Sequence, residues 1–77
     1  MSEWIVSNPD ILGGKPCVKG TRISVELILE LLASGATRDQ ILRSYPQIDQ
    51  QGLTAALEYA AHSLQNEVVW DVKVSAA

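Results

Sequence analysis

Apolar residues between positions 25 and 64 recur every three or four residues, which is the spacing of one face of an α-helix. Gly35 interrupts this pattern once, and Pro46 interrupts it again. Gly commonly ends a helix, and Pro forces the residue before it out of helical geometry. Each of the three segments follows a residue type that favours helix N-caps: Ser24, Thr37 and Asp49. The pattern therefore predicts three helices, with the second ending at Tyr45.

The first predicted helix is unusually apolar. Its polar residues Glu26, Glu30 and Ser34 fall four apart and form one narrow stripe. Such a helix either lies at the centre of the core or buries a second face in a partner subunit. In the third predicted helix, Thr54, Glu58, His62 and Gln65 are expected to face outward. The inward stripe of that helix is expected to contain Leu53, Ala56, Leu57, Ala60 and Leu64.

The segments outside the helices favour extended structure. Residues 3–7, "EWIVS", are rich in strand-forming types, and "KPCV" and "TRIS" flank Lys19-Gly20. This arrangement predicts a short hairpin over residues 15–24 with Gly20 at positive φ. In the tail, alternate residues are apolar, so that they share one face of an extended chain: Val68, Trp70, Val72 and Val74. The tail is expected to join the N-terminal strands, within one chain or across a dimer, or to bind a partner.

Length and composition limit the protein classes. A chain of 77 residues allows one domain, and we divide it into a β element (1–23), a three-helix core (24–66) and a tail (67–77). Without Phe, the core must be aliphatic, and a core this small often gains stability as a homodimer. A lone Cys17, no signal peptide and no long apolar run predict a soluble cytoplasmic protein that does not bind membranes.

Basic residues are concentrated in "GGKPCVKGTRIS", residues 13–24. Lys15, Lys19 and Arg22 give this region a charge of +3, against −6 in the rest of the chain. The phosphate-binding motif G-x-x-x-x-G-K-[ST] is not matched, because Thr21 follows Gly20. The glycines either supply turns alone, or the three cations form a patch for acidic or phosphate groups. Arg22 is the best candidate, since its planar guanidinium can hold such a group with two hydrogen bonds.

The short second helix, the connector "PQID" and the longer third helix have the form of a helix-turn-helix, whose second helix can enter a DNA major groove. Gln50, Gln51 and Thr54 in its first turns could contact base edges. The third helix has no Lys or Arg, so phosphate contacts would come from Arg38 and Arg43. The alternative is that these residues form an ordinary solvated polar face of the helix and do not contact DNA.

Candidate catalytic and metal-binding residues are few. Cys17 and His62 are the single members of their types, and they lack the spacing of metal ligands. No third group that would orient a Cys–His pair is recognisable. We therefore expect no cofactor, no metal and no enzymatic activity.

Five short motifs together resemble a small prokaryotic family known as domain of unknown function 433. They are G-G-K-P at 13–16, G-T-R-I at 20–23, S-G-A-T at 34–37, I-L-x-x-Y-P at 41–46 and A-L-E-Y-A-A at 56–61. The resemblance spans about residues 8–61. It implies a mainly α fold, namely a three-helix homeodomain-like helix-turn-helix bundle with a small N-terminal β-hairpin. It also implies an antitoxin encoded beside a small nuclease with a PIN-like fold.

The leading hypothesis is therefore a dimeric antitoxin that binds and neutralises a PIN-like nuclease and also regulates its own operon. Contact with the nuclease would come from Lys15, Lys19 and Arg22, or from the tail. The alternative is a DNA-binding regulator without a toxin partner. It would use Arg38, Arg43, Gln50, Gln51 and Thr54. A third interpretation is a dimerising domain with neither activity.

Overall fold

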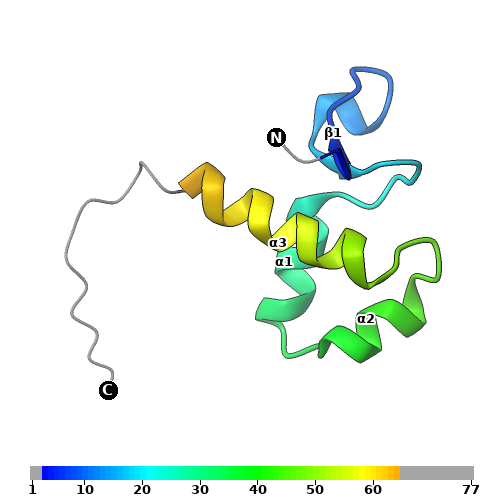
Figure 1. Ribbon diagram of the computed structural model, residues 1–77, viewed down its shortest axis with the longest axis vertical. Coiled ribbons are helices and arrows are strands. Elements are labelled where there is room, and N and C mark those ends of the chain that lie inside the picture. The colour runs from blue at the N-terminus through cyan, green and yellow to red at the C-terminus, as the bar shows by residue number, and fades with distance from the viewer. Residues whose placement is uncertain (1–2, 65–77) are drawn as a thin grey trace.

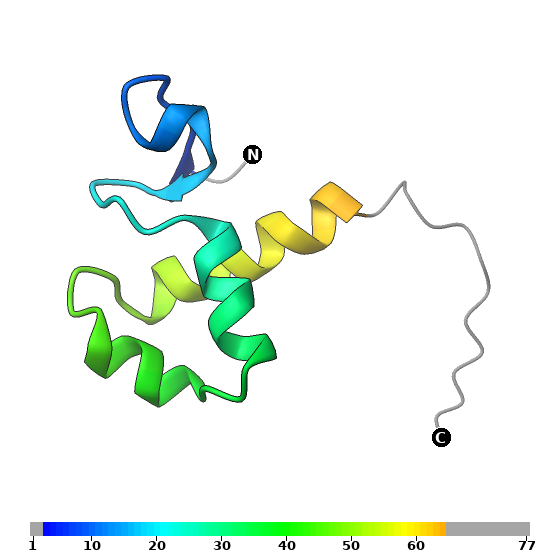
Figure 2. The same ribbon diagram turned by 180° about the vertical axis from the view of Figure 1, so that it is seen from behind.

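Three helices and a small antiparallel sheet make up the fold in the computed structural model, which describes residues 3–64 (Figure 1). The elements are β1 (Ile5–Val6), the 3₁₀-helix η1 (Leu12–Gly14), β2 (Cys17–Val18), α1 (Val25–Ala33), α2 (Arg38–Ser44) and α3 (Gln50–Leu64). The sheet lies on one side of α3 and α2 lies on the other, in both the front and the reverse view (Figures 1 and 2). Among residues 3–64 no helix is long and apolar enough to cross a membrane.

Local side-chain hydrogen bonds start each helix at the predicted position. The Oγ atom of Ser24 accepts from the Leu27 N–H at 2.9 Å, and Asp49 Oδ1 accepts from the Gly52 N–H at 2.9 Å. Thr37 and Gln40 form a reciprocal capping box, in which each side chain accepts from the other residue's backbone N–H. The three predicted helices are thus confirmed, including the end of α2 before Tyr45.

The core lies where α3 packs against α1 and the sheet. Ile28 and Leu53 are completely buried, and Ile41 of α2 is nearly so. The predicted inward stripe of α3 is correct at Leu53 and Ala56 but wrong at Leu64, which is 56% exposed. Gly52 and Ala55 are buried instead. Residues 61–64, at the end of α3, are all exposed.

The predicted hairpin over residues 15–24 forms only as a short bridge, and β2 has a further partner that the prediction did not name. β2 pairs with β1, with Ile5 opposite Val18. The segment after Gly20 contributes an antiparallel bridge between Cys17 and Ser24, and the Ile23 carbonyl accepts from the Val18 N–H. Thr21 tightens the turn, because its hydroxyl donates to the Val18 carbonyl and accepts from the Ile23 N–H. The chain therefore turns tightly and enters α1 at once. The positive φ of Gly20, 81°, is as predicted.

Residues 3–64 cover the apolar surface of α1 only partly. Val25 and Ile28 are buried, whereas Leu27, Leu31 and Leu32 are half-buried. Leu29 is 38% exposed. Leu27, Leu31 and Leu32 still pack against the core, so Leu29 is the large apolar side chain of α1 that stays exposed. The predicted strand between Val68 and Val74 lies outside the described residues.

Candidate functional site

Four of the five predicted DNA-contacting residues lie close together at the start of α3. The Arg38 Nη2 group, on the first residue of α2, donates to Gln50 Oε1 at 2.9 Å and to Thr54 Oγ1 at 2.7 Å. Gln50 and Thr54 are four residues apart and so share one face of the helix. Gln51 is exposed beside them. The tertiary structure thus joins α2 and α3 through one exposed polar cluster, Arg38–Gln50–Thr54.

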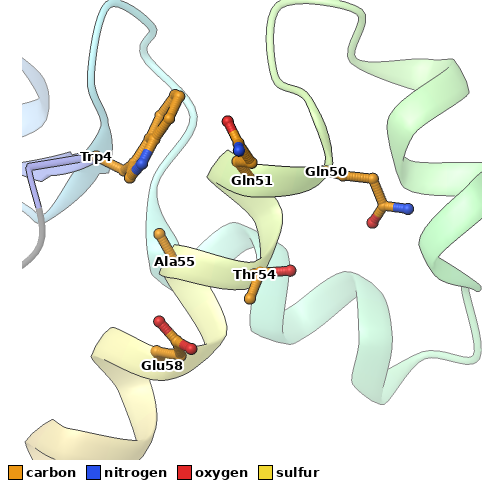
Figure 3. Close-up of a pocket in the computed structure, with 6 residues that line it drawn as sticks. All are labelled: Trp4, Gln50, Gln51, Thr54, Ala55 and Glu58. Carbon is orange, nitrogen blue, oxygen red and sulfur yellow. The ribbon is translucent and has the colours of Figure 1, made fainter.

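A shallow pocket of about 360 Å³ borders this cluster (Figure 3). Gln51 lies toward the indole of Trp4, whereas Gln50 lies on the α2 side of the helix. The pocket therefore combines an aromatic ring with amide and hydroxyl groups, which are the side chains that stack on bases and hydrogen-bond to them. Its lining residues are Trp4, Gln50, Gln51, Thr54, Ala55 and Glu58.

Two features limit the electrostatic attraction of this surface for phosphate. Glu58 lies in the pocket and would repel a phosphate group, and between Gln50 and Leu64 there is no Lys or Arg. Arg43 is exposed but does not join the cluster, because five residues along α2 place it about 140° around the helix from Arg38. Phosphate contacts by Arg38 and Arg43 would therefore lie on different sides of α2.

The three cations of the predicted patch have different surroundings, because one of them forms an ion pair with α1. Lys15 Nζ lies 2.7 Å from Glu26 Oε1 of α1 and donates a hydrogen bond to it. This hydrogen bond and the negative charge of Glu26 raise the pKa of Lys15. The pairing thus supports the folded state below the normal Lys pKa and is lost as pH rises through the raised value. Lys19 and Arg22 remain exposed on the turn at Gly20.

An apolar groove of about 240 Å³ lies between α1 and the C-terminal half of α3. The exposed Leu29 and Leu64 stand at this groove, and Tyr59 contributes its ring. Among residues 3–64, the one charged residue that lines it, Glu26, is paired with Lys15. The groove therefore suits an uncharged, apolar surface. The full lining is Pro16, Val25, Glu26, Leu29, Tyr59, Ala60, Ser63 and Leu64.

Sequence reasoning missed both Trp4 as part of the polar surface and the apolar groove. Trp4 is 46 residues from Gln50, and Pro16 is 48 residues from Leu64, so no local pattern joins these groups. The exceptional apolarity of residues 25–32 was the one useful indication of the groove.

Cys17 and His62 lie in separate elements, β2 and the end of α3. The Cys17 thiol is buried and donates to the Lys15 carbonyl at 3.2 Å, so it fills space in the core. Within residues 3–64, no three His, Cys, Asp or Glu side chains gather as a metal site would require.

Comparison with known proteins gives three matches. The family model described as "Protein of unknown function (DUF433)" matches residues 5–60. An uncharacterized protein, y4eO, of Sinorhizobium fredii (strain NBRC 101917 / NGR234) is 38% identical over 58 residues, which are 75% of this chain and 26% of that protein. The chain thus spans about a quarter of that relative.

The crystal structure of a DUF433 member from Anabaena variabilis superposes with a TM-score of 0.78 at 26% sequence identity. The match covers 83% of this chain and 63% of that chain, somewhat less than two thirds of the solved protein. Three helices with a small two-stranded sheet are therefore an arrangement that this chain shares with a solved relative.

Proposed function

This chain belongs to the DUF433 family, and from its exposed surfaces we propose that it is an antitoxin-type interaction protein, which binds and neutralises a PIN-like nuclease and contacts duplex DNA through α2 and α3. The observation that carries this proposal is the division of α3 into two exposed ends. Its first turns hold the polar cluster Arg38–Gln50–Thr54, and its last turns border an apolar groove. One helix can thereby contact a DNA duplex with its first turns and a second copy of the chain with its last turns.

The DNA-binding part of the proposal rests on the geometry of α2 and α3. In a homeodomain-like helix-turn-helix, the second helix of the pair enters the major groove with its first turns at the base edges. Gln50, Gln51 and Thr54 occupy those turns, and all three are exposed. Arg38 and Arg43 would contact phosphates on the two sides of α2.

A second copy of this chain is the proposed occupant of the apolar groove. Leu64 projects beside the groove that it lines, so a two-fold axis would insert the Leu64 of each copy into the groove of the other. The described residues of the groove present no unpaired charge to the partner copy, because Glu26 is paired with Lys15. Dimers of helix-turn-helix proteins read two half-sites, which fits a regulator of its own operon.

The nuclease is proposed to contact the turn at Gly20. A nuclease that binds metal ions has acidic side chains in its active site, and Lys19 and Arg22 are the exposed cations of this region. Arg22 could engage a carboxylate with two parallel hydrogen bonds. Lys15 is left out of this role, since its charge is already matched by Glu26.

The test is co-expression of the tagged chain with the products of its neighbouring genes, followed by purification, light scattering and a nuclease assay. The expected result is a stable complex in which nuclease activity falls. Arg22→Ala should weaken that complex, by about tenfold or more for a charge-assisted bidentate contact. Lys15→Met is the matched control and should bind normally. Equal affinity of the wild-type chain and the two variants for the nuclease would exclude the Gly20 turn as the contact surface.

A second candidate function is a DNA-binding regulator without a toxin partner, favoured by the hydrogen bonds from Arg38 to α3. It predicts that the chain is recovered alone from the co-expression, and that its affinity for duplex DNA falls steeply with salt. A flat response across many duplexes at low salt would exclude direct DNA binding in either version of the function.

A further inference from the structure

The contact between Arg38 and Gln50 determines which atoms of Gln50 remain for a ligand. A guanidinium group has five N–H donors and no acceptor, and it keeps its proton at all relevant pH values. The Gln50 atom that lies 2.9 Å from Arg38 must therefore be the amide oxygen. The orientation of this amide follows from the chemistry of Arg38 itself.

Thr54 is oriented by the same donor. Its Oγ1 accepts from Arg38 Nη2 at 2.7 Å, so its own hydroxyl hydrogen must point elsewhere. With one lone pair of each oxygen engaged, the cluster offers a ligand the amide N–H groups of Gln50, the O–H of Thr54 and the remaining N–H groups of Arg38. Each oxygen keeps a second lone pair, which lies beside the guanidinium charge. Two helices thus present one patch in which donors predominate.

A patch of donors discriminates among base edges. In the major groove guanine presents two acceptors, N7 and O6, whereas adenine presents one acceptor and one donor. A free Gln side chain matches adenine, because its amide donates to N7 and accepts from N6. In this structure that acceptor already binds Arg38, so the N6 amino group of adenine would have to approach its second lone pair beside the guanidinium charge, whereas the two acceptors of guanine would be attracted to that charge.

We propose that the Arg38–Gln50–Thr54 cluster reads a base edge with two adjacent acceptors, guanine in a duplex, and that Arg38 sets this preference by holding the Gln50 and Thr54 oxygens. The inference rests on the proposed contact between α3 and DNA. It reverses the adenine preference that Gln in these turns suggests by residue type alone. Arg38 acts here as a positioning residue, whether or not it also touches the base.

The acceptors could also belong to a phosphate group, which has the same chemistry but carries no sequence information. The two sources differ in measurable ways. A base contact gives a preference at one position of the site, of about 5- to 150-fold for a good bidentate pair. A phosphate contact weakens all sequences alike when it is removed and lowers the salt slope of binding by about one.

The experiment is selection from a library of randomised duplexes with the full chain, followed by affinity measurements on single-base variants at two salt concentrations. The wild-type chain should select guanine at one position of each half-site. Arg38→Met frees both oxygens, so the preference at that position should shift toward adenine. Arg43→Met is the matched control, since it removes a cation of α2 outside the cluster and should leave the guanine preference intact.

Gln50→Ala provides a second variant at an exposed position, and it should abolish discrimination at the same base pair. Selection of adenine by the wild-type chain, or an unchanged preference in Arg38→Met, would overturn the proposal. A uniform loss of affinity in Arg38→Met with a reduced salt slope and no change of base preference would likewise overturn it, because Arg38 would then act through phosphate alone. Failure to select any duplex would instead overturn the DNA-binding function, and the inference with it.

Discussion

At the scale of single residues, Gly52 shows how close packing constrains a helix. A Cβ atom added there would lie 3.2 Å from Val18 Cγ1 and 3.5 Å from Asp49 Oδ1. The first of these distances is shorter than an ordinary van der Waals contact, so Val18 would have to move. Gly in a helix costs about 1 kcal/mol relative to Ala, and at this position the cost is offset by the close approach of β2.

Gly52→Ala is therefore expected to give little or no gain in the free energy of unfolding. In a Val18→Ala background, where the clash is absent, the same change should stabilise the protein by about 1 kcal/mol. Urea unfolding of the four proteins measures this coupling. Ala61→Gly, at an exposed position of α3, measures how much helix propensity alone contributes to the free energy of unfolding. A full gain for Gly52→Ala in the wild-type background would contradict the packing of β2 on α3.

At the scale of elements, α2 depends on its caps. It has seven residues, well below the length at which an isolated helix is stable in water. Its support comes from the capping box at Thr37 and from the buried side chain of Ile41. Since Arg38 is the first residue of α2, the cap also holds the guanidinium beside Gln50 and Thr54.

Thr37→Ala should lower the free energy of unfolding by about 1 kcal/mol, within the usual range for loss of an N-cap. Ser44→Ala, at the exposed C-terminal end of α2, serves as the control and should change stability by less than about 0.5 kcal/mol. Thermal or urea unfolding distinguishes the two. Equal effects would mean that tertiary packing alone maintains α2.

At the scale of the whole molecule, residues 3–64 leave part of their apolar surface exposed. The groove between α1 and α3 ends at Leu64, the last residue of α3. Across residues 3–64, Leu29 and Leu64 are two of the three large hydrophobic side chains with the highest exposure, and both line the groove. The third, Leu12, lies on η1. This distribution supports self-association through the groove.

Leu29→Gln and Leu64→Gln are therefore expected to weaken the proposed dimer by roughly tenfold or more each, since each removes an apolar side chain from the interface. Light scattering across a range of concentrations measures the change. Ala61→Gln, exposed on α3 outside the groove, should leave association intact. A wild-type chain that stays monomeric at high concentration would exclude the groove as a homodimer interface.

The helices and their ends were predictable from the sequence because the interactions that define them are local. The hydrogen bonds of Ser24, Thr37 and Asp49 each reach three residues along the chain, and Gly20 adopts its positive φ within a single turn. A strand needs a partner that the sequence does not name. β2 pairs with β1, eleven or more residues earlier, in addition to its bridge with the adjacent segment after Gly20.

The amino-acid sequence by itself determined three capped helices, an aliphatic core, the candidate polar residues of α3 and the family resemblance. Only the tertiary structure decided that Arg38 holds Gln50 and Thr54, that Lys15 pairs with Glu26, and that Trp4 borders the polar surface. It also decided that Leu64 remains exposed. These outcomes depend on which elements pack together, because groups separated by 11 to 54 residues have no local geometry that joins them.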